Sequence, residues 1–174
     1  MEKSSGRVLI VDDNEDILLA AKLLLKPHTE FVLTEKNPEN IPNIIKSDNF
    51  DVIFLDMNFT QDMTSGQEGF FWLKEIFKHD PAAIVVLITA YGDVETAVRA
   101  VKEGATDFVL KPWQNEKFLT TYSAALRLRN SKLETDSLRL RQKLMLDKIN
   151  KKFPELIGAS ASMRNIFHTI EKVA

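Results

Sequence analysis

Cysteine is absent from the 174-residue chain, which excludes disulfide bonds and thiolate metal sites and favours a reducing compartment such as the cytoplasm. The histidines, at positions 28, 79 and 168, lie too far apart in the sequence to favour a histidine metal cluster. No apolar run approaches the roughly 18 residues of a membrane span, and residues 1–6 lack the apolar stretch of a signal peptide. We therefore expect no membrane contact.

What the chain does contain is an ordinary globular composition, with 44% hydrophobic and 28% charged residues. The net charge of −2 is unevenly distributed, because residues 1–113 carry a net charge of −8 and residues 114–174 a net charge of +6. An acidic first part is unlike a nucleic-acid binder but is suited to holding a cation. Length and charge together predict one full domain and a smaller region with a different role.

Five short apolar runs are continuous rather than alternating, which indicates strands buried on both faces of a parallel sheet. They are Val8–Val11, Phe31–Leu33, Val52–Leu55, Ile84–Ile88 and Phe108–Leu110. Helical patterns lie between them, at Glu15–Leu25, Glu39–Lys46, Gly69–Phe77 and Val94–Lys102. Pro42 should confine or kink the second helix, and Gly104 should cap the fourth. This alternation predicts an α/β domain built on a five-stranded, doubly wound parallel sheet.

Residues 114–150 contain neither glycine nor proline and predict one long helix, which Phe153-Pro154 ends. Leucines recur there at seven-residue intervals, which indicates pairing with a second copy as a coiled coil, although companion positions such as Asn130 and Ser137 are polar. The stripe comprises Leu119, Leu126, Leu133 and Leu140, continued by Leu144. The basic charge at 126–152 could serve nucleic-acid binding, but a solvated linker face is the preferred interpretation.

Polar side chains follow four of the predicted strands. Asp12 and Asp13 come after the first strand, Asp56 after the third, Thr89 after the fourth and Lys111 after the fifth. In open parallel sheets, ligands bind beyond the carboxyl ends of the strands, where the strand order reverses. Three carboxylates meeting there repel one another and need a cation, and oxygen ligands favour Mg²⁺ over zinc. The hydroxyl and the ammonium complete a set suited to a phosphoryl group.

Each of these residues, taken alone, has a simpler explanation. An Asp-Asp pair after a strand is often only a helix N-cap, a single Asp can cap a turn, and a Lys-Pro pair is common in loops. It is their joint occurrence, each after a separate buried strand, that favours a shared site.

The chain resembles the receiver domain of two-component response regulators, the CheY-like fold, over residues 7–130. Four motifs carry the resemblance: VLIVDDNED at 8–16, VIFLDMN at 52–58, VVLITAYGD at 85–93 and ATDFVLKPW at 105–113. The resemblance implies that Asp56 is a phosphoacceptor served by a sensor histidine kinase in the bacterial cytoplasm. The domain would be a regulatory switch and not an enzyme, with slow autodephosphorylation at most.

The same resemblance implies a Mg²⁺ site. Asp13, Asp56 and the backbone carbonyl of Asn58 would bind the ion directly, and Asp12 would act through water. Lys111 would contact the phosphoryl group.

The resemblance also implies a switch pair, Thr89 and Phe108, in which the hydroxyl turns toward the phosphoryl group and the ring moves inward behind it. Tyr91 would shield the phosphoryl group from water. The bond between Lys111 and Pro112 resembles the family's cis peptide. The loop that follows Asn58 departs from the family pattern, since it is several residues longer and lacks the usual proline.

The last residues, LIGASASMRNIFHTIEKVA at 156–174, are similar to the opening of the AAA+ domain of sigma-54-dependent activators of the nitrogen-regulatory-protein-C type. No G-x-x-x-x-G-K-[ST] motif occurs, so no ATPase activity is expected of this chain. We expect a receiver domain at 1–125, a linker helix at 126–152 and the truncated start of the AAA+ domain at 153–174. The parent transcription factor would contact sigma-54 RNA polymerase, ATP and DNA through parts outside this chain.

Two other functions remain open at this point. A Mg²⁺-dependent aspartyl phosphatase of the haloacid-dehalogenase kind would carry an Asp-x-Asp pair after its first strand, whereas Asp12 and Asp13 are adjacent and Asp56 follows the third strand. A dimerisation module that has lost phosphorylation is disfavoured by the complete set of five polar residues.

Overall fold

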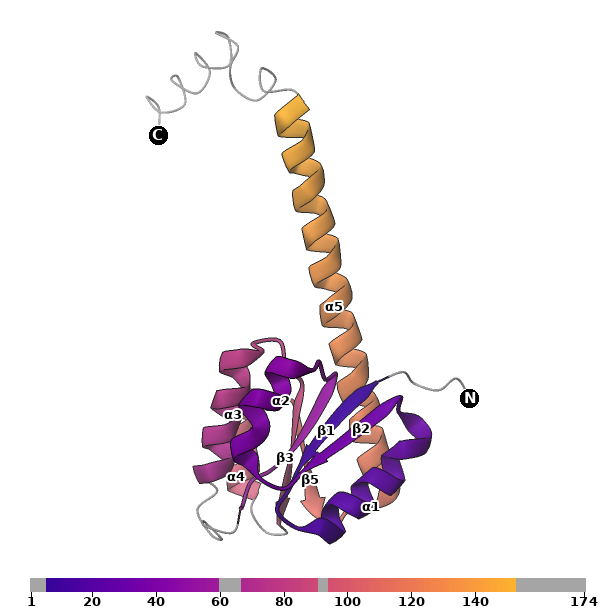
Figure 1. The fold of residues 1–174 in the computed structure, drawn as a ribbon, viewed down its shortest axis with the longest axis vertical. Helices are drawn as coiled ribbons and strands as arrows, with labels where there is room; N and C mark the ends of the chain where they lie inside the picture. The colour runs from indigo at the N-terminus through magenta and orange to yellow at the C-terminus, as the bar shows by residue number, and fades with distance from the viewer. Residues whose placement is uncertain (1–5, 60–66, 91–93, 153–174) are drawn as a thin grey trace. The chain divides into compact units, whose positions relative to one another are not determined.

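The computed structural model describes residues 6–59, 67–90 and 94–152 (Figure 1). The chain divides into two units, Met1–Lys132 and Leu133–Ala174, and the division falls within the long helix α5 (Asn115–Lys152).

The first unit is built on one parallel sheet with the strand order β2-β1-β3-β4-β5. The strands are β1 (Arg7–Val11), β2 (Phe31–Glu35), β3 (Val52–Asp56), β4 (Val85–Ala90) and β5 (Asp107–Lys111). This confirms the predicted five-stranded, doubly wound fold. The strand order reverses between β1 and β3, and Val11 pairs with Leu55 in their register. The carboxyl ends of these two strands therefore lie side by side, at the position where such sheets bind ligands.

Helices cover both faces of the sheet. Alternate strand residues point to opposite sides, and because they are apolar on both sides, each face needs a layer of helices to bury it. Leu9 contributes to the core beneath α2 (Ile41–Ser47), α3 (Gln67–His79) and α4 (Val94–Lys102). Ile10 contributes to the core beneath α1 (Glu15–Leu25) and the first turns of α5. Every residue of β1 from Val8 to Val11 is fully buried, which explains why the run is apolar without alternation.

The helices follow the predicted positions with local differences. Asn14 caps α1, since its side chain accepts hydrogen bonds from the backbone N–H groups of Asp16 and Ile17. The segment predicted as one helix at 39–46 is a 3₁₀ turn, Pro38–Asn40, followed by α2. Pro42 lies in the first turn of α2, where its missing N–H leaves no intrahelical bond unmade. Gly104 has a φ of 110° just after α4, as the predicted cap requires.

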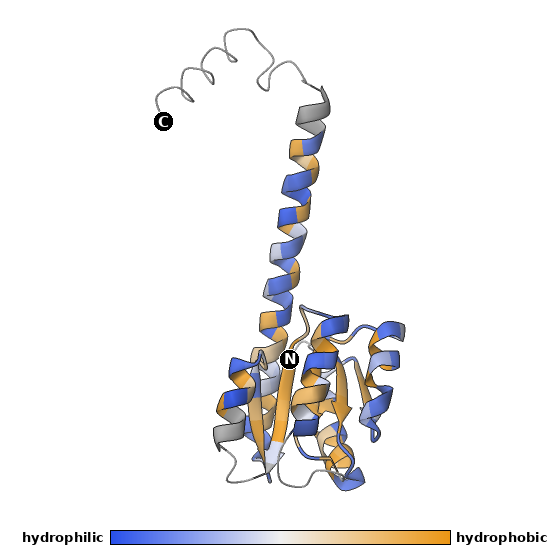
Figure 2. Ribbon diagram, turned by 90° about the vertical axis from the view of Figure 1, so that its left-hand side faces the viewer, coloured by the Kyte–Doolittle hydropathy of each residue, from blue (hydrophilic) through white to orange (hydrophobic). Residues whose placement is uncertain are grey.

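The long helix α5 is confirmed, and its surroundings change along its length. Phe118, Tyr122 and Leu126 are buried in the first unit, whereas Leu133 and Leu140 are 46% and 59% exposed. Figure 2 shows that hydrophilic and hydrophobic residues alternate along this helix, while the strands are predominantly hydrophobic. Within the described residues, no helix is both long enough and apolar enough to span a membrane.

Candidate functional site

Three carboxylates meet at the point where the strand order reverses. Asp12 and Asp13 follow β1, and Asp56 ends β3. One ligand oxygen from each carboxylate lies within 4.8 Å of the other two. Asp12 is 0% exposed and Asp56 2% exposed, whereas Asp13 is half-buried. The structure therefore brings together the three acidic residues that the sequence singled out.

Lys111 joins this cluster from the last position of β5. Its ammonium Nζ lies 2.7 Å from Oδ2 of Asp12 and 3.0 Å from Oδ2 of Asp56, and its side chain is 21% exposed. The peptide bond between Lys111 and Pro112 is cis, as the resemblance implied. Among the described residues, three carboxylates and this one ammonium meet here, which gives the site an excess of negative charge.

Burial and this excess of negative charge shift the proton affinities of the site. Burial raises the pKa of Asp56 to about 6, the nearby charge of Asp12 adds to the rise, and Lys111 offsets part of it. Burial also raises the pKa of the Asp12 carboxyl, although Lys111 opposes the shift. Burial alone would lower the pKa of Lys111, but Asp56 and Asp12 together outweigh it and raise that pKa. A bound cation would stabilise the ionised carboxylates.

Thr89 lies one residue before the end of β4 and is fully buried. Within the described part of the chain, its hydroxyl has no hydrogen-bond partner. Its strand neighbour Ile88 is paired with Asp56, and Thr89 itself with Leu110. A buried hydroxyl in this position has a donor available for an incoming acceptor.

Asn58 follows β3 two residues after Asp56, and Phe108 lies in β5 three residues before Lys111. Asn58 is half-buried, and its side-chain Oδ1 has no hydrogen-bond partner among the described residues. Phe108 is half-buried in β5 and packs against the core beneath α2, α3 and α4. Tyr91, the middle of the loop after Asn58 and the tail at 153–174 lie outside the described residues.

Asn14 is a site residue that the sequence analysis did not single out. Its backbone N–H donates a 3.0 Å hydrogen bond to Oδ1 of Asp12, while its side chain caps α1. The signal was present, because asparagine directly before a helical pattern is a common N-cap. The cap fixes the start of α1 and, through it, the orientation of the Asp12 carboxylate.

Comparisons with known proteins agree with this geometry. The family model described as "Response regulator receiver domain" matches residues 8–123. Alginate biosynthesis transcriptional regulatory protein AlgB from Pseudomonas syringae pv. tomato is 30% identical over 173 residues, which cover 99% of this chain and 36% of the relative. Response regulator protein PilR from Pseudomonas aeruginosa is 29% identical over 171 residues, covering 98% of this chain and 34% of the relative. The chain thus spans about a third of the length of these relatives.

Two solved structures of response regulators are also similar to this chain. The N-terminal signal receiver domain of a two-component response regulator from Bacteroides fragilis is 46% identical, with a TM-score of 0.64, and covers 70% of this chain and 97% of that one. NtrX from Brucella abortus in complex with ADP is 28% identical, with a TM-score of 0.70, over 97% of this chain and 34% of that one.

Receiver domains typically bind Mg²⁺ through acidic residues, and the Asp12, Asp13 and Asp56 cluster supplies the oxygen ligands that this ion prefers. The fold, the acidic edge and the match over residues 8–123 agree: the chain belongs to the response regulator receiver family, alongside transcriptional response regulators of the sigma-54-dependent activator type.

Proposed function

We propose that this chain is a phosphorylation-controlled switch in which a sensor histidine kinase transfers a phosphoryl group to Asp56. The observation that carries the proposal is the buried Asp56 carboxylate, which shares the Lys111 ammonium with a second buried carboxylate, Asp12. An oxygen of Asp56 attacks phosphorus, so an O–P bond forms while the N–P bond of the kinase phosphohistidine breaks. The electron pair of that bond leaves with the imidazole nitrogen.

Asp13, Asp56 and the backbone carbonyl of Asn58 would hold Mg²⁺, with Asp12 acting through water. When bound, the ion neutralises charge on the phosphoryl oxygens. Lys111 would contact a phosphoryl oxygen directly, because its ammonium already lies 3.0 Å from Oδ2 of Asp56.

Thr89 and Phe108 would report the modification to the rest of the domain. The buried Thr89 hydroxyl would donate to a phosphoryl oxygen, and Phe108 would move inward behind it. Tyr91 would restrict the access of water to the acyl phosphate.

A mass measurement tests the assignment of Asp56. Incubation of the protein with acetyl phosphate and Mg²⁺ should add one phosphoryl group, detected as intact mass, and Asp56→Ala should abolish it. The matched variant Asp16→Ala, which changes an exposed carboxylate in α1, should be labelled like the wild type. Chelation of the metal should prevent labelling, because uncompensated carboxylates repel the phosphodonor. A phosphoryl adduct that persists in Asp56→Ala would contradict the proposal.

We also propose that the chain forms a homodimer through α5. The leucines of the heptad stripe beyond the first unit, Leu133, Leu140 and Leu144, are 46%, 59% and 51% exposed. A second copy of the helix is the partner that the seven-residue spacing fits.

The parent protein would be a bacterial, cytoplasmic transcription activator whose AAA+ module is controlled by this receiver. AlgB and PilR match almost the whole of the chain and are about three times as long, which supports a downstream module. On this proposal, residues 1–125 form the receiver, 126–152 the linker helix and 153–174 the start of the AAA+ domain. Contacts with sigma-54 RNA polymerase, ATP and DNA would be made outside this chain.

A further inference from the structure

We propose that Trp113 is a positioning residue for Lys111. Its indole belongs to a series of three packed aromatic rings, Trp113, Phe118 and Phe54, here called the ring ladder. The ladder fixes the backbone directly after Lys111 and so keeps the ammonium beside Asp56. The inference rests on the proposed function, because the position of Lys111 matters for phosphorylation only if Lys111 contacts the phosphoryl group.

Lys111 needs such support because of its place in the sheet. It is the last residue of β5, which in the described part of the chain is an edge strand paired with β4 on one side. Pro112 follows it, is exposed, and lacks the N–H that would continue the pairing with β4. The hydrogen bonds of the sheet therefore secure the chain before Lys111 but not after it.

The ring ladder supplies a restraint on the other side. The ring of Trp113 lies 4.9 Å from that of Phe118, at an interplanar angle of 46°. Phe118, in the first turn of α5, stacks on Phe54 with ring centroids 4.6 Å apart and an angle of 14°. Phe118 and Phe54 are both fully buried. The ladder thus connects the segment after Lys111 to a fully buried part of the core.

The ladder ends in the strand that carries the phosphoacceptor. Phe54 lies two residues before Asp56 in β3, and Trp113 lies two residues after Lys111. The same three rings therefore link the backbone at both members of the 3.0 Å ion pair.

Trp113 is the ladder residue with room to move. It is half-buried and, besides contacting the core, lines a cavity of about 440 Å³ together with Phe108, Pro112 and Lys117. Without the indole, the segment after Lys111 could shift toward this open space. A shift of the Lys111 backbone would carry the ammonium away from the carboxylates.

The test compares initial rates of Asp56 phosphorylation by acetyl phosphate and Mg²⁺, measured by intact mass on the full chain. Trp113→Ala should lower the rate at least about tenfold, whereas Trp113→Phe, which keeps a ring, should stay within about twofold of the wild type. In a protein that already carries Lys111→Ala, adding Trp113→Ala should lower the phosphorylation rate by no more than about twofold. The reason is that Trp113 acts only by positioning the Lys111 ammonium, which this variant lacks.

Leu119→Ala is the matched control. Leu119, in α5, is partly buried against the same core as Trp113 but is not part of the ladder, and its truncation should leave the phosphorylation rate unchanged. Denaturant unfolding of each variant identifies any that is unfolded at the assay temperature. If Trp113→Ala is unfolded, Trp113→Leu replaces it, because leucine keeps apolar volume without a ring. The phosphorylation rate of Trp113→Leu should also fall at least about tenfold.

Three results would overturn the proposal: a wild-type rate for Trp113→Ala, an equal further loss in the Lys111→Ala background, or a similar loss for Leu119→Ala. A wild-type rate for Lys111→Ala itself would instead contradict the proposed role of Lys111. The two failures are therefore distinguishable.

Discussion

At the scale of single residues, the surroundings of Asp56 disfavour its negative charge. Its pKa is raised to about 6, first by burial and then by the charge of Asp12. The pKa of an aspartate in an unfolded chain is about 3.9. The folded protein without metal therefore binds this proton more tightly than the unfolded chain does. The contribution of Asp56 to the free energy of unfolding consequently falls as the pH rises from about 4 to about 6.

Asp56→Asn should remove this penalty. In the presence of a chelator at pH 7.5, the variant should exceed the wild type in free energy of unfolding, by an amount on the order of 2 kcal/mol. The advantage should vanish toward pH 4, where the wild-type carboxyl is protonated as well. Urea denaturation over this pH range measures the difference between the two proteins. A variant that is less stable than the wild type at pH 7.5 would show that the Lys111 ion pair outweighs the cost of burial.

Tyr91→Ala should shorten the lifetime of the phosphorylated protein. Tyr91 lies outside the described residues, so the prediction depends on its place two residues after Thr89, where a bulky ring would restrict the path of the hydrolytic water. After removal of the phosphodonor, intact mass followed over time gives the half-life of the acyl phosphate. An unchanged or longer half-life would contradict the shielding role.

The residues of the site were largely predictable, but their proton affinities were not. Asp12, Asp56 and Lys111 follow buried runs, and parallel strands bring such ends to one edge whatever the details of packing. The raised pKa of Asp56 depends instead on exposed area and on neighbouring charges, which no spacing encodes. The capping role of Asn14 had a signal in the sequence, but its contact with Asp12 did not, because the backbone N–H that donates this hydrogen bond is independent of the side chain.

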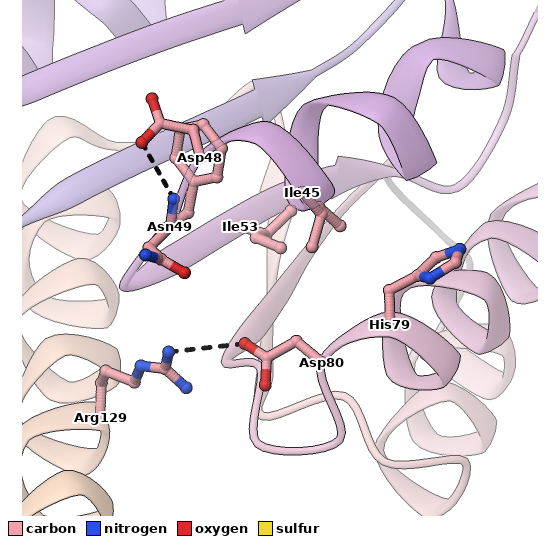
Figure 3. A pocket seen from close by; sticks show the side chains of 8 residues that line it. Ile45, Asp48, Asn49, Ile53, His79, Asp80 and Arg129 are labelled. Atoms are coloured by element: carbon pink, nitrogen blue, oxygen red, sulfur yellow. Dashed lines mark hydrogen bonds and ion pairs between the residues drawn. The ribbon is translucent and has the colours of Figure 1, made fainter.

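At the scale of elements, Arg129 ties α5 to the turn between α3 and β4, as Figure 3 shows. Its Nη1 donates a 2.9 Å hydrogen bond to the carbonyl of Ala82, and its Nη2 lies 3.5 Å from Oδ2 of Asp80. The turn is fixed independently, because Oδ1 of Asp80 accepts a 2.9 Å hydrogen bond from the backbone N–H of Ala82. The side chain of Arg129 is only 11% exposed, so the contact is shielded from solvent.

Arg129→Ala should loosen this part of α5. Amide hydrogen exchange at residues 126–131 should accelerate by roughly tenfold, since a hydrogen bond to a charged group contributes about 1.5–3 kcal/mol when shielded. The exchange rates at 116–122 should change much less. Arg127→Ala, which removes an exposed arginine of the same helix, is the control and should leave the exchange rates unchanged. Equal effects of the two substitutions would show that Arg129 has no special role.

The elements were predicted better in position than in extent. The pattern at 15–25 coincides with α1, because a capping asparagine and an apolar face define the helix locally. The strands differ by one or two residues at their ends, since pairing with a neighbour continues into polar residues such as Glu35, Asp56 and Lys111. The 3₁₀ turn at Pro38–Asn40 was not predicted. Two prolines lie close together there, in the turn and in the first turn of α2, and the apolar pattern does not indicate how they constrain the backbone.

At the scale of the whole molecule, the net charge changes sign where α5 begins, and not at the boundary between the two units after Lys132. The acidic residues 1–113 contain all five strands and the carboxylate cluster, while the basic remainder is chiefly α5. The absence of glycine and proline from 114–150 was sufficient to predict one long helix. Composition alone does not indicate a partner for its exposed leucines; their seven-residue spacing is what favours a second copy of the helix.

The dimer proposal is tested by the molar mass of the protein in solution. Each leucine buried against a second copy contributes roughly 1.5–3 kcal/mol, offset in part by the entropy cost of association. Static light scattering should therefore give a dimer at micromolar concentration, and the double variant Leu133→Asp, Leu140→Asp should be monomeric, because like charges would face each other across the helix pair. Leu19→Asp, Leu23→Asp is the matched control, since these leucines of α1 are similarly exposed, at 56% and 60%, and its dimer should persist. A monomeric wild type, or a dimer that survives in the α5 double variant, would refute pairing through this stripe.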